Sequence, residues 1–263
     1  MKIAISTCVI SDRPVMEFLA DLKSSGFTLL ELSKRARRQI SVPKALRHAG
    51  FDVHSVHANV GPDSLYSPDP ALRRKALEPV FADIDDAARF GPSRYVLHWV
   101  YREPGLPHLH HWRESLGQII NRCQRHRIVL AVETVSHKPQ RFYVPTQQII
   151  DTVGSFGSPW AKMCLDTNHT NVKESLPEVI GACGDLLETL HVSDNHGEVE
   201  EHLPPGDGTI NFDAVVRALQ TIEYTGPFNL EVATIDVPVE NQGSYFKKLH
   251  RMAQDLLERH GAL

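Results

Sequence analysis

The sequence predicts an α/β protein folded as a single (β/α)8 barrel, a TIM barrel, over residues 1–263. The first observation is a repeat, since eight short runs of strand-forming residues alternate with helical patterns. The second is the length of 263 residues, which is typical of this fold. The third concerns the main alternative, an open doubly wound sheet. Such a sheet usually carries a glycine-rich phosphate loop after its first strand, and the segment STCVISDRP at 6–14 contains no glycine.

The expected strands are short runs rich in apolar and β-branched residues. They span 2–7, 28–33, 51–58, 94–99, 128–134, 161–166, 186–193 and 228–233. The expected helices alternate with them, and several begin at a proline or a polar cap or end at a glycine. They span 14–26, 42–50, 70–91, 111–126, 145–156, 175–184, 212–222 and 244–261. The run SKRARRQI at 33–40 is expected to be a loop and the start of a helix.

The composition limits the class of protein. Apolar residues make up 41% of the chain, which is enough for a sizeable core. No apolar run approaches the ~20 residues of a membrane span, and the first residues lack the pattern of a signal peptide. Four widely spaced cysteines favour reduced thiols in a cytoplasmic protein. The net charge of −4 argues against broad binding to nucleic acid. A homo-oligomer of this chain is compatible with the sequence.

Polar side chains end six of the eight expected strands. Because the strands of a barrel end at one mouth, where the active sites of this fold lie, we expect these side chains to converge there. Side chains alternate along a strand, so Glu133 shares its side with Ala131, whereas His54 should face the helices. The residues at the strand ends are His57, His98, Glu133, Asp166 with His169 just beyond it, His191 and Glu231.

A metal site explains this set better than separate roles for each residue. A buried carboxylate or imidazole without a partner costs several kcal/mol, and several around one cavity would repel one another or stay unpaired. A divalent cation removes both problems. Glu31, near the end of the second strand, is expected to line the same pocket or to pair with an arginine.

These residues resemble the xylose-isomerase-like, AP-endonuclease-family-2 superfamily of barrels. The resemblance covers nearly the whole chain and rests on SVHANV, YVLHWV, LAVET, CLDTNH, LHVSDNHG with EEHLPPGDG, and LEVA. The superfamily includes ketose 3-epimerases, hydroxypyruvate isomerases, inosose dehydratases and endonuclease IV. By this resemblance we expect a barrel enzyme that acts on a small-molecule sugar or sugar phosphate.

The resemblance also implies ligand sets. The epimerase pattern implies that Glu133, Asp166, His191 and Glu231 bind one divalent ion, Mn²⁺, Mg²⁺, Co²⁺ or Zn²⁺. The endonuclease pattern adds further ligands and implies up to three Zn²⁺ ions. Glu200 stands where that endonuclease has an aspartate, and Gly197 stands where the epimerases have an arginine. The added residues are His57, His98, His169, Glu200 and His202.

Two classes of reaction follow from these sets. In the first, the ion holds a sugar and Glu133 and Glu231 act as acid and base through an enediolate, giving isomerisation, epimerisation or dehydration. In the second, a zinc cluster hydrolyses a phosphodiester, as in endonuclease IV. A metal-binding barrel without catalysis is a third reading. The basic run after the second strand provides candidate phosphate or substrate ligands, namely Lys34, Arg35, Arg37 and Arg38.

Overall fold

The structure is a computed structural model that describes residues 1–8, 10, 13–58, 63–101, 107–136 and 142–263. Within these residues eight parallel strands form one sheet in the order β7-β6-β5-β4-β3-β2-β1-β8. The two ends of this sheet meet through a parallel bridge between Val192 and Leu230, so the predicted barrel is confirmed. The strands are β1 (Ile3–Ser6), β2 (Leu29–Leu32), β3 (Asp52–His57), β4 (Arg94–His98), β5 (Val129–Glu133), β6 (Ala161–Asp166), β7 (Leu187–His191) and β8 (Phe228–Leu230).

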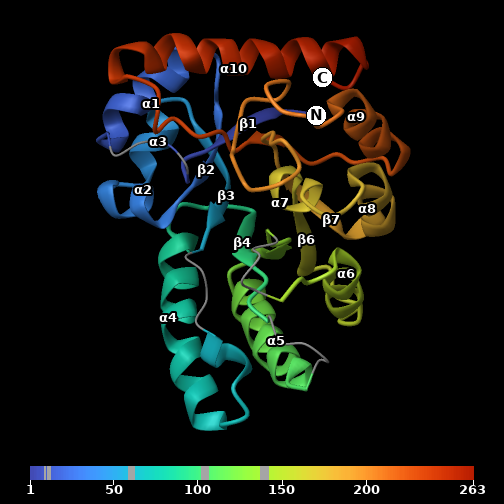
Figure 1. Cartoon of the computed structure of the whole chain (residues 1–263). Coiled ribbons are helices and arrows are strands. Elements are labelled where there is room, and N and C mark those ends of the chain that lie inside the picture. Colours follow the sequence, from blue (N-terminus) through green and yellow to red (C-terminus); the bar gives the residue numbers. More distant parts are fainter. Residues whose placement is uncertain (9, 11–12, 59–62, 102–106, 137–141) are drawn as a thin grey trace.

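Helices surround the strands, and the two chain termini lie close together near α9 and α10 (Figure 1). The amino group of Met1 contacts the carbonyl of Ala262 there. None of the helices in the described residues is both long and apolar enough to cross a membrane. The helices are α1 (Val15–Ser24), α2 (Lys34–Gln39), α3 (Lys44–His48), α4 (Pro70–Ala88), α5 (Leu109–Arg125), α6 (Thr146–Gly154), α7 (Thr167–Asn171), α8 (Leu176–Cys183), α9 (Phe212–Thr221) and α10 (Val239–Arg259).

Two short helices depart from the expected pattern because polar side chains cap them. The Ser33 hydroxyl accepts a hydrogen bond from the Ala36 amide, so α2 begins at once after β2 and takes in most of the basic run. Asp166 ends β6 and its carboxylate accepts from the amides of Asn168 and His169, which starts α7. The last helix begins at Val239, after Pro238, rather than at 244.

The barrel interior has an apolar layer below the strand ends. Val96, Ala131 and Cys164 form a buried cluster there, separate from the larger core between strands and helices. Each stands two residues before a polar strand end, and side chains two apart share one side of a strand. The expected placement of Ala131 on the side of Glu133 is therefore confirmed.

The strand alternation behind the expectation that His54 faces the helices does not hold at this position. The pairing of β2 with β3 shifts register, since Leu30 pairs with Val53 and Glu31 pairs with Ser55, which leaves His54 as the extra residue of a bulge. Its Nε2 lies 3.3 Å from the Ser55 hydroxyl. Burial lowers the pKa of His54 to about 4, while Glu31 and Asn229 act to raise it. His54 is buried, and the bulge breaks the alternation on which the expectation rested.

Candidate active site at the carboxyl end of the barrel

A cavity of about 700 Å³ opens at the carboxyl ends of the strands. This is where the active sites of (β/α)8 barrels lie. All five of the additional ligands inferred from the endonuclease pattern line it, together with Glu231. The lining residues are Cys8, Ser33, Lys34, Arg35, His57, Ala58, His98, His169, Glu200, His202 and Glu231.

Four strand ends bring the epimerase-type ligand set together below this cavity. Each of Glu133, Asp166, His191 and Glu231 offers one ligand atom, and these atoms all lie within 4.8 Å of one another. His191 Nδ1 is 2.9 Å from Glu133 Oε1, 3.0 Å from Glu231 Oε2 and 3.9 Å from Asp166 Oδ2. All four residues are buried. One imidazole nitrogen therefore faces three carboxylates in a space that water scarcely reaches.

Glu31 sets the orientation of His191. His191 Nε2 lies 2.9 Å from Glu31 Oε1, and the hydroxyls of Ser6 and Ser55 donate to the two Glu31 oxygens at 2.8 and 2.7 Å. A carboxylate can only accept in this contact, so Nε2 carries the proton and Nδ1 is left to face the acidic group. A carboxylate behind the imidazole is a common arrangement for a metal-binding histidine. Glu31 is thus fully buried and lies outside the cavity lining, and its partner is a histidine rather than an arginine.

The surroundings of the Asp166 carboxylate show whether the four-residue cluster can hold a cation. Its Oδ1 accepts from the Asn168 and His169 amides at 2.6 and 3.0 Å. Its Oδ2 is buried and has no hydrogen-bond partner among the described residues. Burial raises the pKa of Asp166, and the charge of His169 only partly opposes this. A buried carboxylate oxygen aimed at two other carboxylates and an imidazole nitrogen is suited to bind a divalent ion.

The electrostatics of the glutamates depend on the histidines. Burial alone would raise the pKa of Glu133, but the charges of His98, His191 and His57 hold it well below its ordinary value. Burial also acts to raise the pKa of Glu231 and of Glu31, but the charge of His191 outweighs it. The pKa of Glu231 is therefore lowered, and that of Glu31 falls to about 2. These carboxylates are therefore ionised at neutral pH.

His57 and His98 form a second group with Glu133. Their Nε2 atoms lie 2.9 and 3.0 Å from Glu133 Oε2. His57 Nδ1 donates to the Ala58 carbonyl at 2.7 Å, which leaves Nε2 as the nitrogen that faces the carboxylate. Burial lowers the pKa of His57, but Glu133 outweighs it and raises the value to about 9. Without a cation, this contact requires a proton on Nε2.

His169, Glu200 and His202 form a third group at the rim. His202 Nε2 lies 3.1 Å and His169 Nε2 3.6 Å from Glu200 Oε1. Both imidazoles donate from Nδ1 to a backbone carbonyl, His169 to Thr134 at 2.9 Å and His202 to Glu231 at 3.0 Å. The longer side chain of Glu200 therefore does not prevent it from reaching both histidines.

Asp194 organises the loop that carries Glu200 and His202. Its Oδ2 accepts from the amides of Gly206 and Gly208 at 2.8 and 3.0 Å, and its Oδ1 accepts from Ile210 at 3.0 Å. This carboxylate is thus engaged with the backbone. It shapes the loop and takes no place in the cavity lining.

The basic run divides between the cavity and the protein interior. Lys34 and Arg35, in the first turn of α2, line the cavity, and Lys34 also lies 3.1 Å from Asp83. Arg37 is buried and pairs with Asp83 and Asp86 of α4 at 3.0 and 2.8 Å. Arg38 is exposed outside the lining. Because the run is helical, residues a turn apart face different neighbours, and the structure does not bring Arg37 and Arg38 to the mouth.

Cys8 lines the cavity and has a potential metal-binding side chain, but it was not among the site residues expected from the sequence. It stands two residues beyond the end of β1, so its signal was the same strand-end position that marked the histidines. Burial and the carboxylates of Glu231 and Glu31 raise the pKa of its thiol well above the ordinary value. A cysteine in this setting is a poor free nucleophile.

Fold and site together define a (β/α)8 barrel with a buried cluster of carboxylates and imidazoles at its carboxyl end. Residues 19–255 match the family described as xylose isomerase-like TIM barrel, and the chain belongs to that family. A D-psicose 3-epimerase of Enterocloster bolteae is 23% identical over 269 residues, covering 92% of this chain and 84% of that protein.

Solved structures of the same fold are similar over almost the whole chain. An L-ribulose 3-epimerase superimposes with a TM-score of 0.83 at 19% identity, covering 98% of this chain and 95% of that one. A D-psicose 3-epimerase from Clostridium cellulolyticum H10, solved with D-tagatose, has a TM-score of 0.82 at 17% identity, covering 98% and 99%. At these identities the superposition establishes the shared fold.

Proposed function

We propose that this protein is a metal-dependent epimerase or isomerase of a small ketose sugar, with Glu133 and Glu231 as its acid/base pair. The observation that carries the proposal is the cluster of four strand-end ligands around Asp166 Oδ2, which accepts no hydrogen bond from the part of the chain that the structure describes. The names of the related proteins, which are 3-epimerases of ketoses, support the same reaction.

The ion would be held by Glu133, Asp166, His191 and Glu231. Three carboxylates and one imidazole suit Mn²⁺, Mg²⁺ or Co²⁺, and Zn²⁺ also accepts such ligands. When bound, a divalent ion draws electron density from the carbonyl and the neighbouring hydroxyl of a sugar and makes the adjacent C–H bond more acidic. The side chains around the cavity then have two tasks, to orient the sugar and to move protons.

Glu133 and Glu231 come from β5 and from the end of β8, on either side of the cluster. One ionised carboxylate takes the proton from the carbon next to the carbonyl, which leaves an enediolate and a protonated glutamate. The other glutamate is also ionised at the start, so it first takes up a proton from water through the open cavity. It then delivers that proton to the opposite face of the same carbon or to the neighbouring carbon. Proton exchange with water through the open cavity then restores the original pair. Return to the same carbon is epimerisation, and return to its neighbour is isomerisation.

The rim of the cavity bears on substrate choice. Lys34 and Arg35 line it, and these cations suit either the distal hydroxyls of a free ketose or a distal phosphate. Gly197, where the epimerases have an arginine, offers no side chain to the sugar. The other rim groups, His202 among them, are therefore the proposed hydroxyl contacts in its place.

The test is to incubate the Mn²⁺-loaded protein in heavy water with D-psicose, D-tagatose, L-ribulose and one phosphorylated ketose. Proton abstraction from carbon predicts one solvent deuterium in the product, seen by mass spectrometry or proton NMR. Glu231→Gln and Glu133→Gln should retain metal and lose turnover by ~10²–10⁴, the loss typical of a missing general base. The matched control is Glu198→Gln, because Glu198 is exposed in the loop that carries Glu200.

Products without deuterium would overturn the two-glutamate scheme and would point to an internal hydride shift. Full activity in both glutamine variants would overturn the assignment of the pair. Arg35→Gln completes the design, since it should lower kcat/KM for the phosphorylated ketose alone if Arg35 binds phosphate.

The second candidate is hydrolysis of a phosphodiester by a zinc cluster. The groups His57, His98 and Glu133, and His169, Glu200 and His202, favour it because each could hold a further ion. The charge pattern opposes it, since Arg37 is buried against Asp83 and the net charge of the chain is −4. Incubation of the zinc-loaded protein with duplex DNA that contains an abasic site decides between them. If the wild type cleaves this DNA and His98→Ala does not, hydrolysis of a phosphodiester becomes the favoured function.

A further inference from the structure

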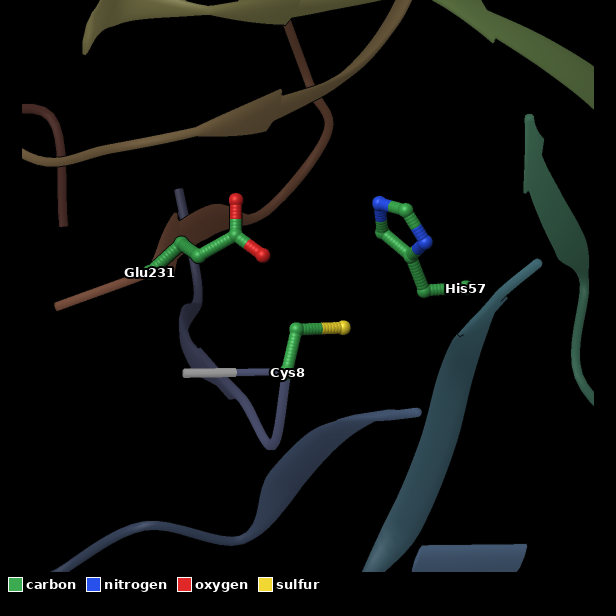
Figure 2. Close-up of side chains that lie close together, drawn as sticks. All are labelled: Cys8, His57 and Glu231. Atoms are coloured by element: carbon green, nitrogen blue, oxygen red, sulfur yellow. The ribbon is translucent and has the colours of Figure 1, made fainter. Parts of the chain in front are cut away.

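Cys8 has no part in the mechanism above, yet it reaches the same cavity. Its amide donates to the Ser6 hydroxyl at 3.3 Å, and its side chain is among the lining groups. Figure 2 shows the sulfur directed into the space between the Glu231 carboxylate and the His57 imidazole. Three chemically different ligand groups thus converge from the ends of β1, β3 and β8.

The spacing of these groups suits a cation. One ligand atom from each of Cys8, His57 and Glu231 lies within 4.8 Å of the other two. Zinc–ligand bonds of about 2.0–2.3 Å place neighbouring ligand atoms roughly 3–4 Å apart in a tetrahedral site. Cys8 is only partly buried, and ion binding would have to shorten separations that are at most 4.8 Å to this range.

Two of the three groups are already held in place. His57 is 7% exposed and Glu231 is 4% exposed. His57 donates from Nδ1 to the Ala58 carbonyl at 2.7 Å, which leaves Nε2 as the nitrogen able to bind an ion when the group is neutral. The same Nε2 lies 2.9 Å from Glu133 Oε2, so a bound ion would take the place of the proton that this contact otherwise requires.

We propose that Cys8, His57 and Glu231 form a second cation site, which takes a thiophilic divalent ion of the Zn²⁺ class. The carboxylate-rich cluster suits hard ions, whereas a thiolate ligand selects zinc and similar ions over Mg²⁺. Binding converts the Cys8 thiol to a thiolate and removes the proton from His57 Nε2, and both protons leave to solvent through the cavity. Three protein ligands leave the fourth position open to water or to a substrate oxygen, as in catalytic zinc sites. The site goes beyond the proposed epimerase activity, although it shares Glu231 with the four-ligand set.

Cobalt provides a direct test, because Co²⁺ bound to a thiolate has a sulfur-to-metal charge-transfer absorption in the near ultraviolet. The full chain is exchanged into Co²⁺ and titrated. The wild type should develop this absorption, and Cys8→Ser should lose it while keeping the visible absorption of cobalt bound at carboxylates and imidazole. Cys164→Ser is the matched control, since the buried Cys164 thiol lies beside Glu133 and His191; it should keep the charge-transfer absorption. Absence of the absorption in the wild type, or its loss in Cys164→Ser alone, would overturn the proposal.

A second measurement needs no variant. Alkylation of Cys8 by iodoacetamide is followed by mass spectrometry in protein loaded with Mg²⁺, with and without added Zn²⁺. Zinc should slow the alkylation of Cys8 at least tenfold, whereas further Mg²⁺ should not. Equal rates would overturn the site even if the ketose assays succeed, and slowed alkylation would support it even if those assays fail.

Discussion

At the scale of single residues, His191 shows how one side chain is prepared for two different partners. Its Nε2 faces Glu31 at 2.9 Å, and its Nδ1 faces Glu133 and Glu231 at 2.9 and 3.0 Å. Glu31 is held in turn by Ser6 and Ser55. The carboxylate behind the ring thus decides which nitrogen is available to an ion, and it does so from a strand that supplies no proposed ligand.

Replacing Glu31 with Gln should therefore weaken metal binding without removing a ligand. The amide keeps the size of the side chain but loses the charge that holds the Nε2 proton, and such outer partners are typically worth 10–100-fold in affinity. Competition with a fluorescent chelator measures Mn²⁺ affinity directly. Glu198→Gln, a change on the exposed loop surface, should leave it unaltered. An unchanged affinity in Glu31→Gln would show that His191 needs no such partner.

At the scale of elements, the loop between β7 and α9 depends on a close backbone approach. A Cβ added at Gly208 would lie 2.4 Å from the Asn195 carbonyl oxygen and 2.4 Å from Asp194 Oδ1. Asp194 is the residue whose carboxylate binds the Gly206, Gly208 and Ile210 amides. Only glycine fits at 208 without moving the loop that carries Glu200 and His202.

Gly208→Ala should accordingly destabilise the fold by about 1–3 kcal/mol, the usual cost of overpacking. The displaced loop should also impair binding at the rim. Urea unfolding measures the first effect, and the KM for the ketose measures the second. Gly181→Ala provides the control, because Gly181 lies within α8 and a Cβ there meets no atom within 4 Å. A Gly208→Ala protein as stable as this control would refute the argument.

A buried ion pair between Arg37 of α2 and Asp83 of α4 holds these two helices together. Asp83 accepts from Arg37 at 3.0 Å and from the Tyr95 hydroxyl at 2.8 Å. Burial acts to raise the pKa of Asp83, but Arg37 and the hydrogen bonds lower it. Asp83→Asn leaves Arg37 buried without its counter-charge and should cost about 3–5 kcal/mol at neutral pH.

The pH dependence of this difference has a definite sign. A lowered folded pKa means that the stability is fully present above the ordinary Asp value of about 3.9 and is lost as the pH falls through the folded pKa. The gap between the wild type and Asp83→Asn in urea unfolding should therefore be constant from pH 6 to 8 and narrow below about pH 4. Asp255→Asn, at a side chain that is 61% exposed, should show little difference at any pH. A gap that widens in acid would contradict the assignment.

At the scale of the whole molecule, the proposed metal site couples binding to stability because its ligands come from four strands. An ion that binds only the folded chain stabilises it by about 2.7 kcal/mol at 100 times its Kd. We expect the unfolding temperature to rise with Mn²⁺ concentration in the wild type and to change little in Asp166→Asn, where the α7 cap survives because Asn is also a good cap. Asp185→Asn, on the exposed surface, should behave as the wild type. An equal rise in Asp166→Asn would remove Asp166 from the ligand set.

The sequence by itself determined the barrel and the residues at its mouth. Strand-forming runs alternate with helical patterns, and parallel strands in a barrel all end at one edge, so Glu133, Asp166 and His191 could be placed together before any coordinates were known. The structure places them at the ends of β5, β6 and β7, within reach of one another.

Only the tertiary structure decided which side chains face one another across that mouth. Three features had no counterpart in the sequence patterns. They are the bulge at His54, the pairing of Glu31 with His191, and the separation of Arg35 from Arg37. Alternation along a strand predicts only whether a side chain lies on the same face of the sheet as the other side chains of that strand. Contacts between strands that are not adjacent depend instead on the register, the bulges and the closure of the whole sheet, which no single segment contains.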